Sequence, residues 1–305
     1  MTYLLHILIL ICIYSILSLS LNLLVGYTGI LSVAHAAFYG VGAYIAALMA
    51  LQLHTPFLLN IILALIGAAV VGAVIGIPSL RIKDDYFIIA TFGFQIIVFS
   101  LMNNLVGFTG GPLGLPGIPQ PAIFGYVIST HLQYLILSGL LAGFTYFVCA
   151  RIIRSPYGRV VKGIREDEVF ITAAGKNVTL FKVKTFMVSA ALAAIGGVLY
   201  ATYITYIDPT SFTVMESIFI ISIVIIGGAG SLKGPIVGAI VLVALPEILR
   251  FVGLPNSIAA NIRQILYGGL LVVFMMWRPQ GFMGEYGFRQ GRVGTELPEE
   301  EPAVE

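Results

Sequence analysis

The sequence predicts an all-α, polytopic membrane protein of about 8–10 transmembrane helices, some of which are candidates for discontinuous helices. Three observations carry this prediction. Of 305 residues, 59% are apolar and 10% are charged, whereas soluble domains have about 25% charged residues. The apolar residues form runs of membrane-spanning length, and half of the 16 Lys and Arg residues are concentrated in one segment, 151–184.

The apolar runs give the helices in order. A helix needs about 20 apolar residues to cross the hydrocarbon layer, and six runs meet this length clearly: 4–25, 30–52, 57–77, 86–106, 132–150 and 185–206. Three weaker runs follow at 217–230, 234–252 and 263–277. The first two of these are short or broken by glycine, so they can be two spans or half-helices packed inside the protein.

These runs define one transmembrane domain, residues 1–284. The remaining segment, 285–305, is acidic and rich in proline. Such a composition cannot bury enough apolar surface to fold, so we expect a disordered tail.

The charges orient the chain in the membrane. Lys and Arg resist translocation, so the basic segment 151–184 is predicted to be cytoplasmic. Residues 107–131 carry no charged side chain and are predicted to be external. The carboxyl end falls on the cytoplasmic side, while the side of the amino terminus depends on the weaker spans.

Several kinds of chemistry are excluded. The segment 228–234 is the nearest approach to a nucleotide-binding phosphate loop, but its spacing is wrong. The four histidines show no metal-ligand spacing, and no Ser/His/Asp set is recognisable. Cys12 and Cys149 lie in apolar runs and are expected to be small buried residues. We expect this chain to catalyse no reaction and to bind no cofactor, metal or nucleic acid. A lipid bilayer surrounds it.

Two glycine-rich segments interrupt the apolar pattern. The first places polar residues and glycines where membrane depth is expected, namely Asn22, Gly26, Gly29, Ser32 and His35. Polar groups at that depth are costly unless they face protein or a water-filled cavity. The segment is either a discontinuous helix that lines a solute path or a short loop between two spans with His35 bonded internally. About 200 residues later the rhythm is loosely repeated by Gly227, Gly228 and Gly230.

Two loops are candidate interaction surfaces. The external loop contains Gly110, Gly111 and Pro112, and it can dock a binding protein, cap a solute path or simply connect two spans. In 151–184, Ser155 and Pro156 suit a helix start, and a second short helix can begin at 166–168. This segment is either a docking site for a soluble partner or a solvated loop.

Several motifs in fixed order resemble the Liv-type branched-chain amino-acid permeases. The segments 21–29 and 35–38 resemble the first signature of that family, and 109–112 with 117–119 resemble the external loop of its M-type subunit. The cytoplasmic coupling loop of that family is similar to the segments 154–159, 164–168 and 175–178. The pattern ends with the segments 227–231 and 278–281. The resemblance covers about residues 15–283.

The resemblance implies a permease subunit of an ATP-driven ABC importer in the prokaryotic plasma (inner) membrane. It would pair with a second, H-type permease, with two cytoplasmic ATP-binding subunits that bind ATP and Mg, and with an extracytoplasmic solute-binding protein. The solute would be a branched-chain amino acid, or alternatively another neutral amino acid, urea or a short amide. The coupling loop to the ATPases would contain Arg154, Ser155, Pro156, Gly158, Arg159, Arg165, Glu166, Asp167, Glu168 and Gly175.

The rival class is an ion-coupled secondary carrier. Such a carrier needs ionisable residues near the bilayer midplane. Only Asp208, Glu216 and Glu247 are acids near the late spans, and all lie close to predicted ends or interruptions. The sequence therefore favours the importer.

Overall fold

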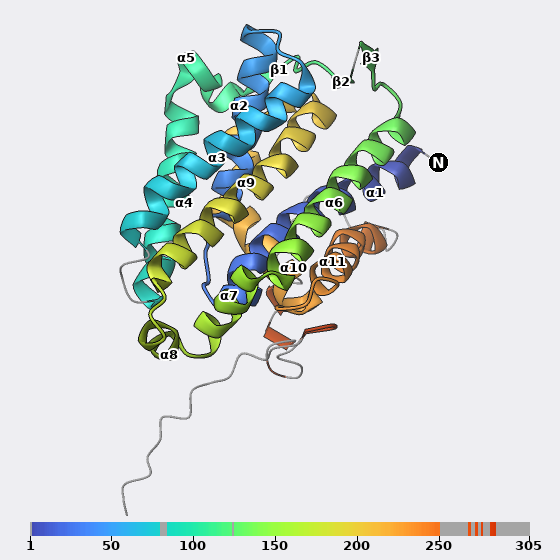
Figure 1. The fold of residues 1–305 in the computed structure, drawn as a ribbon. Helices are drawn as coiled ribbons and strands as arrows, with labels where there is room; N and C mark the ends of the chain where they lie inside the picture. Colours follow the sequence, from blue (N-terminus) through green and yellow to red (C-terminus); the bar gives the residue numbers. More distant parts are fainter. Residues whose placement is uncertain are drawn as a thin grey trace, which may run out of the picture.

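The computed structural model describes residues 2–79, 84–123, 125–250, 268, 269, 272, 273, 276 and 281–284. In this part of the chain six helices are long and apolar enough to cross a membrane (Figure 1). They are α1 (Thr2–Asn22, extended by a π-helix, η1, Leu23–Thr28), α2 (His35–Gln52), α3 (Phe57–Ser79), α4 (Asp84–Asn104), α6 (His131–Arg154) and α9 (Val178–Ile204). The all-α prediction and its first six spans are confirmed.

Two shorter helices follow the six. They are α10 (Val214–Gly227) and α11 (Gly234–Arg250), which at 1.5 Å per residue are about 21 and 26 Å long. At this length α10 does not cross the roughly 30 Å hydrocarbon layer fully as a straight, upright helix, whereas α11 is described only as far as Arg250. Of the predicted span 263–277 only residues 268, 269, 272, 273 and 276 are described, and the tail 285–305 lies outside the described residues.

Helix α9 packs against both α2 and α3, which also contact each other, while α1 contacts α6, α9 and α11. Glycines let α2 and α9 approach closely. A Cβ on Gly197 would lie 2.1 Å from the Tyr39 carbonyl oxygen, and one on Gly42 would lie 2.5 Å from Ala194 Cα. Such small-residue contacts are typical of helices that pack in lipid.

The two ends of the bundle differ. One end carries α5 (Val106–Thr109), η2 (Gly111–Leu113) and two small sheets, in which β1 (Leu115–Pro116) pairs with β4 (Tyr206–Ile207) and β2 (Ala122–Ile123) with β3 (Tyr126–Val127). The opposite end carries α7 (Pro156–Glu166) and α8 (Glu168–Ala173) (Figure 1). The uncharged loop and the basic segment therefore lie on opposite sides, as predicted, and the start of α1 lies at the uncharged end.

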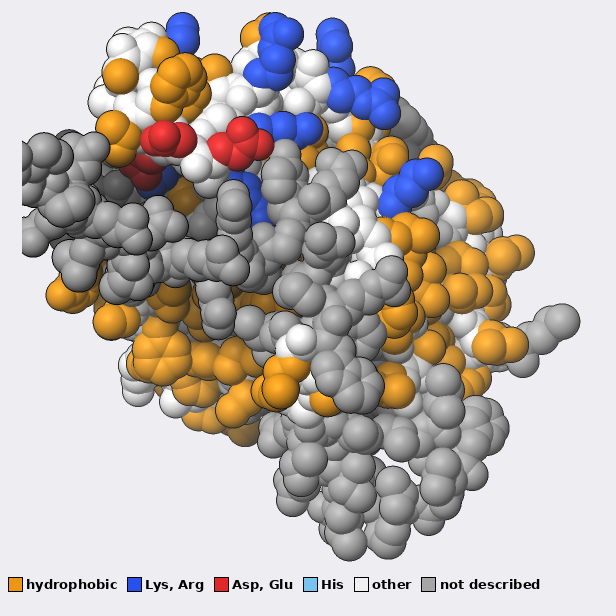
Figure 2. All heavy atoms as spheres, turned by 90° about the horizontal axis from the view of Figure 1, so that it is seen from below, with side chains coloured by type: hydrophobic (Ala, Val, Ile, Leu, Met, Phe, Trp, Pro, Cys, Tyr) orange, Lys and Arg blue, Asp and Glu red, His pale blue; other side chains and the backbone are white. Residues whose placement is uncertain are grey.

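The flank and the end of the molecule have different surfaces. Large apolar side chains are exposed along the long helices, including Ile66, Val74, Ile97, Leu140 and Phe144. Figure 2 views the molecule from the end that bears α7 and α8, and it shows Lys and Arg side chains gathered on one side of that face above an apolar flank. This distribution suits a lipid-embedded belt with a charged end outside it.

Candidate functional site

The first candidate site is the segment 151–184, which folds into two short helices. At the end of α6, Ser155 Oγ accepts a hydrogen bond from the Gly158 amide at 3.3 Å, and Pro156 occupies the first position of α7. Both are favoured helix-start features. Only glycine fits at position 158 without a steric clash, because a Cβ there would lie 2.3 Å from the Ile153 carbonyl oxygen. The predicted helix start is confirmed.

Helix α7 is amphipathic and packs on η1. Its apolar face buries Val161 and Ile164. On the same side, Lys162 Nζ lies 5.5 Å from the centre of the Tyr27 ring, a cation–π distance. A Cβ on Gly29 would lie 3.0 Å from Arg165 Cγ. The structure thus brings the predicted coupling residue Arg165 against the predicted path residue Gly29.

Helix α8 is held by polar contacts at its start. Asp167 Oδ1 accepts a hydrogen bond from the Phe170 amide at 2.9 Å, which confirms the second short helix. Glu168 Oε2 lies 2.7 Å from Lys182 Nζ, and this pair joins α8 to the buried Lys182 side chain on α9. Gly175 has a positive φ of 76°, which glycine adopts without strain. Asn177 then caps α9 through the Leu180 amide at 3.0 Å.

The outer surface of α8 is apolar. None of its six residues is buried in the described part of the protein, and the side chains of Val169 and Phe170 are 78% and 67% exposed. Three predicted coupling residues that lie near α8 in the sequence are also exposed, namely Arg154, Arg159 and Glu166. Sequence reasoning missed Val169 and Phe170, whose only signal was two apolar residues after an acidic run.

Tyr157 fixes α7 to α9. Its hydroxyl lies 2.9 Å from Thr185 Oγ1 and donates to the Phe181 carbonyl oxygen at 3.0 Å, while its ring stacks on Phe181 at 5.0 Å. Burial raises the pKa of the Tyr157 hydroxyl above its ordinary value. The base of the basic segment is therefore a rigid platform rather than a loose loop.

The second candidate site is formed where the two glycine-rich segments meet. Asn22 Oδ1 accepts from the Gly230 amide at 3.0 Å, and Asn22 Nδ2 donates to the Ser231 carbonyl oxygen at 2.8 Å. A Cβ on Gly26 would lie 2.4 Å from the Gly230 nitrogen. Asn22, Gly26 and Gly230 are thus brought together in the protein interior, which the loose sequence echo did not reveal.

The other predicted path residues are also buried, except Gly29, which is exposed. His35 Nε2 lies 2.8 Å from Ser20 Oγ, and Ser32 Oγ accepts from the Ala34 amide at 3.3 Å. The segment 29–34 is a short irregular connection between η1 and α2. It matches the alternative of a short loop with His35 bonded internally. A Cβ on Gly227 would lie 2.1 Å from the Gly234 carbonyl oxygen, and Gly228 has a positive φ of 113°. A role of these residues in solute passage stays a prediction.

A polar cluster that sequence reasoning missed lies around Gln95 of α4. Gln95 Oε1 accepts from the Ala37 amide at 2.7 Å, and Gln95 Nε2 donates to the Phe212 carbonyl oxygen at 2.8 Å. Ser217 Oγ accepts from the Ala36 amide at 2.9 Å and donates to Gln95 Oε1 at 3.3 Å. These bonds satisfy orphan donors at the start of α2. They also tie together α2, α4, α10 and the segment η3 (Pro209–Phe212).

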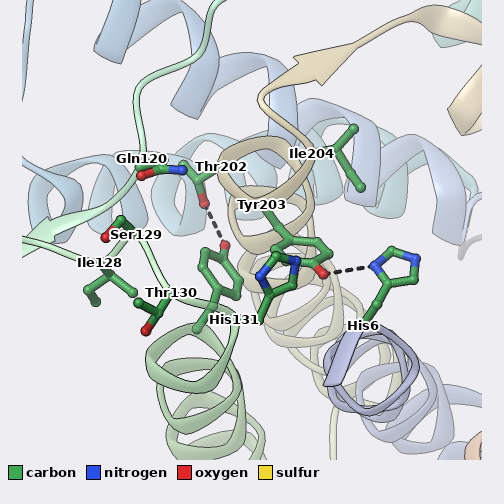
Figure 3. Close-up of a pocket in the computed structure, with 10 residues that line it drawn as sticks. His6, Gln120, Ile128, Ser129, Thr130, His131, Thr202, Tyr203 and Ile204 are labelled. Atoms are coloured by element: carbon green, nitrogen blue, oxygen red, sulfur yellow. Dashed lines mark hydrogen bonds between the residues drawn. The ribbon is translucent and has the colours of Figure 1, made fainter. Parts of the chain in front are cut away.

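At the opposite end, residues of the predicted external loop help to line a pocket of about 260 Å³ (Figure 3). Tyr203 OH lies 2.7 Å from His6 Nδ1, and Tyr134 OH lies 2.8 Å from Thr202 Oγ1 on its wall. The pocket is lined by His6, Gln120, Ile128, Ser129, Thr130, His131, Tyr134, Thr202, Tyr203 and Ile204. Among the described residues no group of three or more His, Cys, Asp or Glu side chains could hold a metal ion.

The glycines of the external loop shape a tight turn. Gly110 and Gly111 have positive φ angles of 72° and 56°, a region that glycine enters at little cost. Thr109 Oγ1 accepts from the Gly111 amide at 3.2 Å, and Pro112 lies in η2. This turn is remote from 151–184, so the two predicted interaction loops serve opposite faces.

Comparison with known proteins decides the family. Residues 3–275 match a family described as the permease component of branched-chain amino-acid transport systems. The chain belongs to this family. It is 35% identical over 294 residues to the high-affinity branched-chain amino-acid transport permease LivM of Salmonella typhimurium, covering 89% of this chain and 68% of that protein.

Two further relatives carry related names. The probable LivM of Methanocaldococcus jannaschii is 28% identical over 89% of this chain and 90% of its own length. The permease LivH of Salmonella typhimurium is 24% identical over 89% of this chain and 91% of its own length. No solved structure matches the chain.

In this member of the permease family, two acids near the late spans have structural contacts. Asp208 Oδ1 accepts from the Ser211 amide at 3.1 Å and from Ser211 Oγ at 2.7 Å. Glu216 Oε1 accepts from Tyr14 OH at 2.7 Å. These contacts give Asp208 and Glu216 local roles and do not favour an ion-coupled carrier.

Proposed function

We propose that the chain is the M-type permease subunit of an ATP-driven importer of branched-chain amino acids. The family match and the names of the LivM and LivH relatives support this solute class over urea, short amides and other neutral amino acids. In the proposed assembly it pairs with an H-type permease in the prokaryotic plasma membrane. Two ATP-binding subunits, which hold ATP and Mg, and an extracytoplasmic solute-binding protein complete the importer.

The segment 151–184 is the proposed docking surface for an ATP-binding subunit on the cytoplasmic side. The observation that carries this proposal is the exposure of Val169 and Phe170 on α8. Apolar side chains on the flank of the bundle are covered by lipid, but α8 lies at the charged end, where water would surround it (Figure 2). Two large apolar side chains there need a protein partner, and the rigid base of the segment can transmit its movement.

Replacement of Phe170 by alanine tests the docking surface. Full burial of a Phe side chain contributes about 1.5–3 kcal/mol, and the exposed two thirds of Phe170 can contribute about 1–2 kcal/mol on docking. Phe170→Ala should therefore weaken binding of the ATP-binding subunit about 5- to 30-fold. Binding is measured between the purified permease subunits and the purified ATP-binding subunit.

Phe147→Ala is the matched control. Phe147 is 66% exposed, nearly the same as Phe170 at 67%, but it lies on the long helix α6 within the apolar belt. We expect its replacement to leave the affinity for the ATP-binding subunit unchanged. Equal affinities for the Phe170→Ala variant and the unaltered chain would contradict docking through α8.

Uptake of labelled leucine tests the solute. In vesicles that contain the complete importer, leucine uptake should require ATP and should not be reduced by excess urea. Uptake that persists without ATP and collapses with an uncoupler would instead favour an ion-coupled carrier.

A further inference from the structure

A second cavity, of about 340 Å³, lies between α6 and α9 near the basic end of the bundle. Helices α6 and α9 make few contacts with each other, whereas α1 packs on both (Figure 1). Leu23 of η1, which continues α1, lines the cavity. The wall is largely apolar, and it is formed by Leu23, Ile152, Ser155, Tyr157, Lys184, Thr185, Met187 and Val188. It is distinct from the exposed surface of α8.

The rim of this cavity is basic. Lys184 lines it directly and is exposed. Arg151 and Arg154 are exposed in the last turn of α6, which also carries the lining residue Ile152. The acids of the segment lie elsewhere, at 166–168, where Glu168 is already paired with Lys182. The entrance therefore favours a negatively charged group.

The depth of these charges suits a lipid headgroup. Lys184 lies six residues inside the start of α9, about 9 Å along the helix, and Arg151 lies three residues before the end of α6, about 5 Å from it. Long basic side chains at such positions extend toward the membrane interface while their stems lie against apolar surface. Basic pockets between transmembrane helices bind anionic headgroups.

We propose that the cavity is a binding site for an anionic phospholipid of the adjacent leaflet. One acyl chain lies in the apolar slot against Leu23 and Val188, and the phosphate lies between Arg151 and Lys184. The bound lipid fills the space that α6 and α9 leave open and stiffens the base of α7. The site requires only that the chain is in a membrane, so it stands apart from the proposed solute and the proposed ATPase docking.

The test measures lipid retention by the full chain in its assembled complex. The complex is purified in detergent with equal amounts of phosphatidylglycerol and phosphatidylcholine, and bound lipids are counted by native mass spectrometry. The unaltered chain should retain phosphatidylglycerol preferentially. A charge near a membrane surface changes lipid binding about fivefold, so Arg151→Gln with Lys184→Gln should reduce that preference on the order of 30-fold.

Two further variants sharpen the result. Lys176→Gln removes an exposed charge of the same segment away from the cavity, and its lipid preference should equal that of the unaltered chain. Val188→Phe keeps both charges but fills the slot, and it should lose both lipids. Equal retention of the two lipids by the unaltered chain would overturn the proposal. So would a crosslink from Val188→Cys, in a chain without Cys12 and Cys149, to another protein subunit in the assembled complex.

Discussion

Gln95→Leu is the most informative change in the membrane core. Leucine has a similar volume, but it removes the amide that accepts from Ala37 and donates to the Phe212 carbonyl oxygen. The Ala37 amide keeps a second bond, to the Ala34 carbonyl oxygen at 3.1 Å. The loss therefore falls on the Phe212 carbonyl and the Ser217 hydroxyl.

The magnitude follows from these partners. A buried polar group left unpaired costs about 1–3 kcal/mol, while interhelical bonds in membranes average about 0.6 kcal/mol because the unfolded chain also finds partners. Since two groups are affected and the cluster joins four elements, we expect Gln95→Leu to lower the free energy of unfolding by about 1–3 kcal/mol.

The free energy of unfolding is measured by titrating the folded protein in mixed micelles with a denaturing detergent. Gln52→Leu is the control, because Gln52 is an exposed glutamine at the end of α2. It should change the free energy by less than about 0.5 kcal/mol. If Gln95→Leu is no more destabilising than Gln52→Leu, the cluster does not hold these helices together and the reasoning is refuted.

The same titration tests two close contacts. Gly197→Ala should destabilise the protein by about 1–3 kcal/mol, because its Cβ would lie 2.1 Å from the backbone oxygen of Tyr39. Gly139→Ala is the control, because its Cβ would meet nothing within 4 Å. It should be neutral or stabilise the protein by up to about 1 kcal/mol. Equal effects would refute the tight contact of α2 with α9. Asn22→Ala should lower the free energy of unfolding by about 1–3 kcal/mol, since it leaves the Gly230 amide and the Ser231 carbonyl unpaired. An unchanged free energy of unfolding would show that the contact between the two glycine-rich segments does not depend on these bonds.

The long spans were predictable because a run of about 20 apolar residues has few alternatives in lipid. The short helices α7 and α8 were also predictable, since their starts are encoded locally by Ser155, Pro156 and Asp167. The predicted span begins at 185, seven residues after the start of α9 at Val178. The sequence assigns Lys182 and Lys184 to the loop, whereas both lie in α9, and the buried Lys182 side chain contacts Glu168 of α8.

The polar contacts between distant elements were not predictable from the sequence. Gln95 is one polar residue in an apolar run, and its partners Ala37, Phe212 and Ser217 are up to 122 residues away in the chain. Asn22 was identified as unusual, but its partner at Gly230 is 208 residues away. Composition marks such residues as costly in lipid, while only the packed fold shows which groups satisfy them.

The structure connects the proposed docking surface to the glycine-rich interior through α1. Helix α7 contacts η1, where Lys162 lies over Tyr27 and Arg165 packs on Gly29. One turn earlier, Asn22 holds Gly230. The intervening π-helix is a rare conformation that is frequent at functional sites. Because Gly158 and Tyr157 fix α7 to its neighbours, displacement of α8 cannot be absorbed by a loose loop. We therefore expect a displacement of α8 to reach the end of α1, and with it the contact between the two glycine-rich segments.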